Sequence, residues 1–95
     1  MHLSTREIKK LLQKWHFYKA YTSSSGADEL TRKITAVEKA ITSLDDVDKT
    51  IIRLKYFQRL EVDMIQSQVF LSRSVVYWRI DKAIGEIAYL VANMA

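Results

Sequence analysis

The sequence has no cysteine, no proline and only two glycines among its 95 residues. The lack of cysteine excludes disulfide bonds, thiolate metal sites and cysteine nucleophiles, and it fits a reducing compartment. The scarcity of proline and glycine leaves few points where a helix would be interrupted. No apolar run approaches the roughly 18 residues that span a bilayer, and the N-terminus lacks the apolar region of a signal peptide. We therefore expect a soluble cytoplasmic protein.

The size and composition predict one globular domain over residues 1–95. Apolar residues make up 48% of the chain and charged residues 27%, a balance that supports a hydrophobic core. So short a chain leaves little room for a cleft between two subdomains, and it contains neither a Gly-rich phosphate loop nor a Ser/His/Asp arrangement. His2 and His16 do not have the spacing of a zinc motif. We predict no enzymatic activity, no cofactor and no metal.

The charge is mildly basic and unevenly distributed. Fifteen Lys and Arg residues against eleven Asp and Glu give a net charge of +4. Residues 1–27 carry five basic and one acidic side chain, whereas residues 61–95 carry three basic and four acidic ones. Lys9, Lys10 and Lys14 lie on one face of the first predicted helix, which we interpret mainly as a solvated face, with contact to a DNA backbone or to RNA polymerase as the alternatives. The overall excess slightly favours polyanionic partners.

Apolar spacing of three and four residues predicts an all-α fold that begins with a helical hairpin over residues 1–43. Ser4 and Glu7 form a capping box for a first helix that extends to about residue 20. The polar stretch from residue 22 to residue 27 reads as the main turn, after which Asp28 or Ser25 caps a second helix. The apolar seam of the second helix has heptad spacing and consists of Leu30, Ile34, Val37, Ile41 and Leu44. This seam should pack on the first helix, pair with a second copy in a homodimer, or both.

Residues 44–95 predict three further helices, for about five in all. Asp45 and Asp48 stand at the start of a third helix that ends near Phe57, and we interpret these acids as capping and dipole partners in preference to a divalent-ion site. A connection over residues 58–60 leads to a fourth helix over residues 61–69. Ser72 is a natural N-cap for a fifth helix.

The fifth helix is predicted to have one buried and one outward face. Val76 and Ile80 begin its apolar side, and Trp78 lies opposite them. Gly85 indicates a close helix crossing or a flexible end. A strand over residues 74–78 is the alternative, although the chain offers no second strand to pair with it.

The C-terminal half resembles a known family. The spacing of Tyr56, Glu61, Ile65, Ser72 and Arg79, with apolar residues between, is similar to the promoter-recognition region of sigma factors. It looks still more like small phage regulators of late transcription, of the RinA and ArpU type. The family's glycine in the turn is replaced by Phe70, and the alanine after its buried isoleucine by Gln66.

The resemblance implies a helix-turn-helix that binds double-stranded DNA in a bacterial host cell, with RNA polymerase as a further partner. The start of the fifth helix would then face the major groove with Arg73, Ser74, Tyr77 and Trp78. Arg73 is the candidate for reading guanine. The candidates for phosphate contacts are Arg79, Lys82 and Arg59.

Two other functions use the same surface. A helical protein-interaction module, such as a phage inhibitor of a host nucleic-acid enzyme, would bind a protein through Tyr77 and Trp78. A DNA-packaging recognition subunit would also carry a helix-turn-helix but would assemble into rings. We therefore expect, first, a sequence-specific transcription regulator. Its binding to DNA should weaken steeply as salt rises, whereas binding to an apolar protein surface should not.

Overall fold

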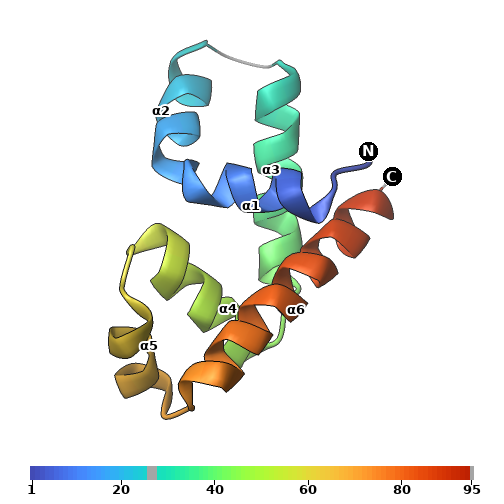
Figure 1. Ribbon diagram of the computed structural model, residues 1–95. Helices are drawn as coiled ribbons and strands as arrows, with labels where there is room; N and C mark the ends of the chain where they lie inside the picture. The colour runs from blue at the N-terminus through green and yellow to red at the C-terminus, as the bar shows by residue number, and fades with distance from the viewer. Residues whose placement is uncertain (26–27, 95) are drawn as a thin grey trace.

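The computed structural model describes residues 1–25 and 28–94, without the side chains of residues 23–25. Every regular element in these ranges is helical, which confirms the predicted all-α class. The described residues form six α-helices and one π-helical segment, where the sequence predicted about five helices (Figure 1). The elements are α1 (Thr5–Gln13), α2 (Trp15–Ser25), α3 (Glu29–Thr42), α4 (Asp46–Ile52), η1 (Arg53–Phe57), α5 (Val62–Val69) and α6 (Arg73–Ala92).

The predicted first helix is divided into two. The capping box of α1 is present, since the Glu7 amide donates to Ser4 Oγ at 3.1 Å. The helix then ends at Lys14, and α2 turns away from α1 (Figure 1). Trp15 at the start of α2 stacks on Phe57 with ring centroids 5.1 Å apart. The break therefore accompanies a contact between residues 42 positions apart in sequence, which local periodicity does not report.

α2 and α3 run antiparallel (Figure 1), so the helical hairpin predicted over residues 1–43 is present only in its part after α1. Asp28, and not Ser25, is the N-cap of α3, where its Oδ1 accepts from the Thr31 amide at 2.9 Å. The predicted turn begins later than expected, because α2 continues to Ser25. The rest of that predicted turn, Gly26 and Ala27, lies outside the described residues.

The heptad seam of α3 is buried inside a single chain. Ile34, Val37, Ile41 and Leu44 are buried, Leu30 is partly buried against the same core, and α3 packs against α6 and α2. The seam is therefore not exposed for the predicted contact with a second copy, because its side chains already pack within the chain. The seam is a core element of the monomer.

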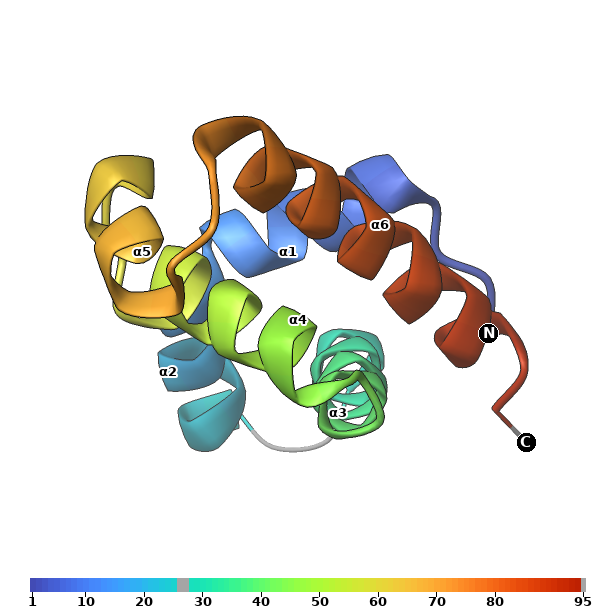
Figure 2. The ribbon, with the colours of Figure 1, turned by 90° about the horizontal axis from the view of Figure 1, so that it is seen from below.

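α6 is the helix around which the core forms. It packs against α1, α3, α4 and α5, and in Figure 2 α3 and α4 lie together beside it while α1 passes behind it. The buried stripe of α6 is the predicted one, and its members are Val76, Ile80, Ala83, Ile84, Ile87 and Val91. No helix in the described ranges is long and apolar enough to cross a membrane.

Gly85 does not have either role that the sequence suggested. A Cβ atom placed on Gly85 would meet nothing within 4 Å, so no neighbouring helix crosses closely there. α6 also continues past Gly85 to Ala92, so this glycine does not end the helix. Both interpretations of Gly85 were wrong.

Candidate functional site

The connection between α5 and α6 is three residues long and contains one residue in the left-handed region. Phe70 has φ 57° and ψ 42°, a conformation that costs a residue with a Cβ atom roughly 1–2 kcal/mol. Its amide donates to the Gln66 carbonyl at 2.9 Å and closes the end of α5. Phe70 thus adopts the conformation for which glycine would be preferred, and its side chain is 89% exposed.

Ser72 begins α6 as the sequence predicted. Its Oγ accepts from the Val75 amide at 3.3 Å, and its extended backbone (φ −70°, ψ 160°) is typical of an N-cap. This cap fixes where α6 starts, and the buried stripe that begins at Val76 then decides which side chains of the first two turns face outward. The segment over residues 74–78 is helical, which excludes the alternative of a strand.

The first two turns of α6 present four predicted site residues on one exposed face. Arg73 and Ser74 are exposed, Tyr77 is 45% exposed and Trp78 is 58% exposed. Trp78 lies opposite the buried Val76, as predicted. An indole with more than half of its surface in solvent contributes little to the core and is available for contact.

Arg73 is oriented by two neighbours. Its Nη1 donates to Asp63 Oδ1 of α5 at 2.6 Å, and its Nη2 lies 3.4 Å from the Tyr77 hydroxyl. The guanidinium also lies over the Tyr77 ring, 5.5 Å from the centroid. An exposed ion pair of this kind contributes about 0–1 kcal/mol, less than the 1–3 kcal/mol of a bidentate guanine contact. Arg73 can therefore leave Asp63 for a base at a small net cost.

Arg79 and Lys82 hold a buried carboxylate. Asp48 of α4 is fully buried, with Arg79 Nη1 2.9 Å from Oδ1 and Lys82 Nζ 3.0 Å from Oδ2. Asp45 lies 4.0 Å from Arg79 and 3.8 Å from Lys82, so two carboxylates balance the two cations. These cations, which the sequence placed near phosphates, instead connect α6 to the N-terminus of α4.

The same cluster supports Trp78. Lys82 Nζ lies 5.3 Å from the centroid of the Trp78 ring, on the side toward Asp48. The hydrogen-bonding contact with Asp48 raises the pKa of the Lys82 ammonium, and the charge of Asp45 adds to the rise. Lys82 is therefore charged at neutral pH, and the cluster lies along one edge of the exposed face of α6.

Sequence reasoning missed the role of Asp48, which it treated as one of several acids in a first helical turn. A signal for burial was present. Leu44, Asp48, Ile51 and Ile52 follow one another at four, three and one residues, so Asp48 falls on the apolar stripe of α4. A charged residue on such a stripe indicates a buried partner, although not which one.

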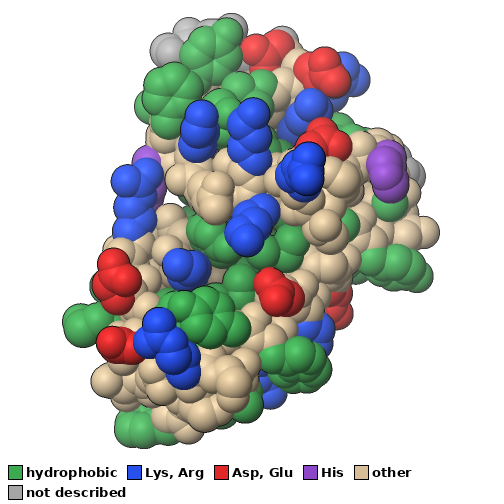
Figure 3. All heavy atoms as spheres, viewed as in Figure 1, with side chains coloured by type: hydrophobic (Ala, Val, Ile, Leu, Met, Phe, Trp, Pro, Cys, Tyr) green, Lys and Arg blue, Asp and Glu red, His purple; other side chains and the backbone are tan. Residues whose placement is uncertain are grey.

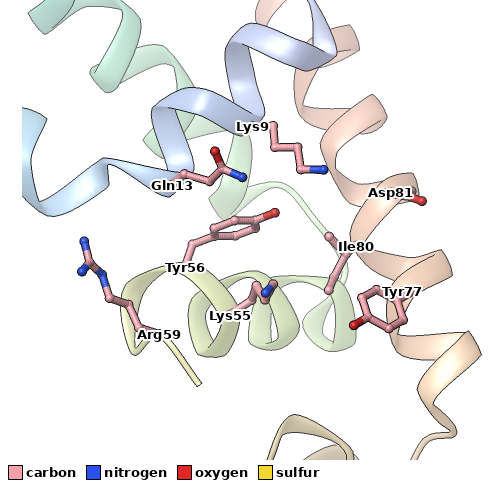
Figure 4. A pocket seen from close by; sticks show the side chains of 8 residues that line it. All are labelled: Lys9, Gln13, Lys55, Tyr56, Arg59, Tyr77, Ile80 and Asp81. Carbon is pink, nitrogen blue, oxygen red and sulfur yellow. The ribbon is translucent and has the colours of Figure 1, made fainter. Parts of the chain in front are cut away.

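Arg59 lies across an open groove from Tyr77. It is the second residue of the predicted connection over residues 58–60, and it has a left-handed backbone (φ 56°). Figure 3 shows Lys and Arg side chains over α1 and around the hollow below it. The groove has a volume of about 520 Å³ and is lined by Lys9, Gln13, Lys55, Tyr56, Arg59, Tyr77, Ile80 and Asp81 (Figure 4).

Tyr56 lies in the middle of this groove in Figure 4, although most of its surface is buried. Burial raises the pKa of the Tyr56 hydroxyl above its usual value, and the negative charge of Asp81 adds to the rise. The hydroxyl is therefore protonated at neutral pH and can donate a hydrogen bond.

The structure divides the predicted site residues into three groups. Arg73, Ser74, Tyr77 and Trp78 share the exposed face of α6. Arg59 lines the groove that borders the Tyr77 side of α6. Arg79 and Lys82 bind Asp48 on the other side of α6, near Trp78. Among the described residues, no three His, Asp or Glu side chains are grouped as metal ligands would be.

Comparison of the chain with known protein families, curated proteins and solved structures gave no match.

Proposed function

We propose that this chain is a sequence-specific DNA-binding transcription regulator in which α5 and α6 act as a helix-turn-helix and α6 is the recognition helix. The observation that carries the proposal is the exposed face at the start of α6, with Arg73, Ser74, Tyr77 and Trp78 side by side behind the Ser72 cap. Four such side chains at the N-terminal end of a helix are suited to a major groove. The phage late-gene regulators that the sequence resembles would use their C-terminal half in this way.

Each side chain has a distinct chemical task in this proposal. The Arg73 fork matches the O6 and N7 acceptors of guanine, and Asp63 orients it before DNA arrives. Tyr77 and Trp78 provide apolar surface for thymine methyl groups and sugars. Ser74 can donate to or accept from a base edge or a phosphate.

The cluster around Asp48 positions the recognition helix and does not bind phosphates. Its four charges sum to zero, so it adds little to the attraction of a polyanion. It holds α6 against α4 within a few residues of Trp78. A recognition surface needs this rigidity, because a misplaced helix loses base contacts.

A homodimer remains part of the proposal, through a surface other than the α3 seam. Two copies related by a two-fold axis would place two α6 helices on half-sites roughly 34 Å apart. Sedimentation of the free chain and of its complex with duplex DNA tests this assembly, and one chain per DNA site in the complex would contradict it.

A protein-binding role is the second candidate, and one observation favours it. Phe70 is 89% exposed in a strained backbone conformation, and Met64 of α5 is 54% exposed. An apolar side chain kept at such a position has no evident benefit for folding. Phe70→Gly is expected to relieve the strain, so a loss of partner binding without a loss of DNA binding would favour this role.

The test of the first proposal is selection from a pool of random duplex DNA, followed by sequencing of the retained molecules. We expect a recurrent sequence, with affinity that falls steeply as salt rises. Trp78→Ala should weaken this binding. Tyr89→Ala is the matched control, because Tyr89 is an exposed aromatic residue (68%, against 58% for Trp78) near the other end of α6. No enrichment, or equal effects of the two variants, would contradict the proposal.

A further inference from the structure

The groove between α1, η1 and α6 contains cations that have no carboxylate partner. Lys9, Lys55 and Arg59 line it, and none of them takes part in an ion pair with any described residue. Asp81 is the one acidic side chain in the lining, so the lining residues carry a net charge of +2. By contrast, Arg73, Arg79 and Lys82 of α6 are all paired with aspartates.

The arrangement of these cations suits an extended anion. In Figure 4, Lys9 lies on the α1 side of the groove and Arg59 lies at the far end of η1, with Tyr56 between them. Cations that converge on one point would select a single small anion, but these are spread along the groove. Gln13 and Tyr56 add uncharged hydrogen-bond donors between them.

The groove is continuous with the exposed face of α6. Tyr77 lines the groove, and the Arg73 guanidinium lies over the Tyr77 ring. A DNA strand whose bases meet Arg73 would therefore have phosphates within reach of the groove. Phosphate contacts at the edge of a recognition helix set the orientation of the protein on the duplex.

We infer that this groove binds the phosphodiester backbone of the DNA duplex whose bases α6 reads, with Lys9, Lys55 and Arg59 as the phosphate contacts. The inference rests on the proposed function and assigns it a second contact surface, which α1, η1 and Arg59 form beside α6. It also gives α1 a role in binding, whereas the sequence favoured a solvated face over contact with the DNA backbone. The sequence preference belongs to α6, and the groove contributes affinity.

The experiment compares two triple variants with the same change of charge. Lys9→Gln/Lys55→Gln/Arg59→Gln removes the groove cations, and Arg32→Gln/Lys39→Gln/Lys49→Gln removes two lysines and one arginine that do not line the groove. The binding of each to the selected duplex is measured by fluorescence anisotropy from low to high salt. Because each phosphate contact contributes about 0.9 to the slope of log affinity against log salt, the groove variant should lose about 2–3 from this slope. The control should keep the parental slope.

The outcomes separate the groove from the recognition helix. A groove variant that loses slope but selects the same sequence supports the inference. A groove variant with the parental slope overturns it, and the proposed function stands if Trp78→Ala still weakens binding. Equal losses in both triple variants also overturn it, because the effect would then be one of net charge. A parent chain that binds no duplex overturns the groove and the proposed function together.

A single substitution provides the same test without the risk of a poorly folded triple variant. Arg59 is exposed, so Arg59→Glu should leave the fold intact, as circular dichroism can verify. It should reduce affinity at low salt by at least tenfold, whereas Lys39→Glu on α3 should change it by less than threefold. Equal effects of these two substitutions would overturn the inference.

Discussion

Arg79 Nη1 of α6 donates a 2.9 Å hydrogen bond to Oδ1 of Asp48, a fully buried residue of α4 that lies 31 positions earlier in the chain. Lys82 completes the pairing at the other carboxylate oxygen. The contact joins the start of the third predicted helix to the proposed recognition helix. It holds α6 against α4 close to Trp78, whose ring lies beside Lys82.

Asp48→Ala should destabilise the chain by about 3 kcal/mol, because it removes the buried partner of two cations. Asp46→Ala is the control, since Asp46 is an exposed acid in the same helical turn and should cost less than 1 kcal/mol. Urea unfolding followed by tryptophan fluorescence gives both values. Similar losses for the two variants would show that Asp48 acts only through the helix dipole.

Arg73→Ala and Lys82→Ala should affect DNA binding differently. Arg73→Ala should cost about 1–3 kcal/mol on the selected sequence and relax one base position. Lys82→Ala should leave the salt slope near that of the parent, because Asp48 already balances the Lys82 charge. Anisotropy titrations at several salt concentrations measure both effects. If the slope of log affinity against log salt falls by about one unit in Lys82→Ala, Lys82 contacts a phosphate after all.

Asp45→Asn should make the chain less sensitive to acid. The Asp48 amide, and then the charges of Lys82 and Arg79, hold the pKa of Asp45 below its usual value. A lowered pKa stabilises the folded state above the unfolded pKa of about 3.9, and this contribution is lost as pH falls through the folded pKa. The parent should therefore be more stable than Asp45→Asn at pH 7. The difference in their free energies of unfolding should shrink below about pH 4.

The measurement is the free energy of unfolding of both chains from pH 7 to pH 2.5. Asp28, whose pKa is also lowered, is present in both and contributes the same acid sensitivity to each. A stability difference that is independent of pH would assign the effect of Asp45 to something other than its charge.

Gly85→Ala should stabilise the chain by about 0.5–1 kcal/mol, because alanine favours a helix interior and the added methyl group meets no atom within 4 Å. The melting temperature should rise and DNA binding should not change. A loss of stability would mean that another chain or element approaches Gly85 closely in solution.

Ile34→Asp should unfold the chain, because Ile34 is buried inside the monomer and an aspartate there would have no partner. Circular dichroism should show loss of helix at every protein concentration. If the variant were instead a folded monomer while the parent sedimented as a dimer, the α3 seam would be a dimer interface after all.

The sequence by itself determined where most helices begin. Ser4, Asp28, Asp45 and Ser72 each cap a helix through an amide three residues later, so the signal and its effect lie within one turn of chain. The apolar stripe of α6 was also determined locally, because periodicity alone reports which side is buried. The exposure of Trp78 follows from that stripe.

Tertiary structure decided what depends on residues far apart in the chain. The break after α1 lets Trp15 reach Phe57, and the burial of Asp48 requires Arg79 and Lys82. The groove that holds Arg59 exists only because α1, η1 and α6 meet there. Periodicity and capping describe single helices, whereas ion pairing, ring stacking and grooves are properties of pairs and triples of helices. The free energies of these contacts depend on distance in space, which the local pattern of residues does not contain.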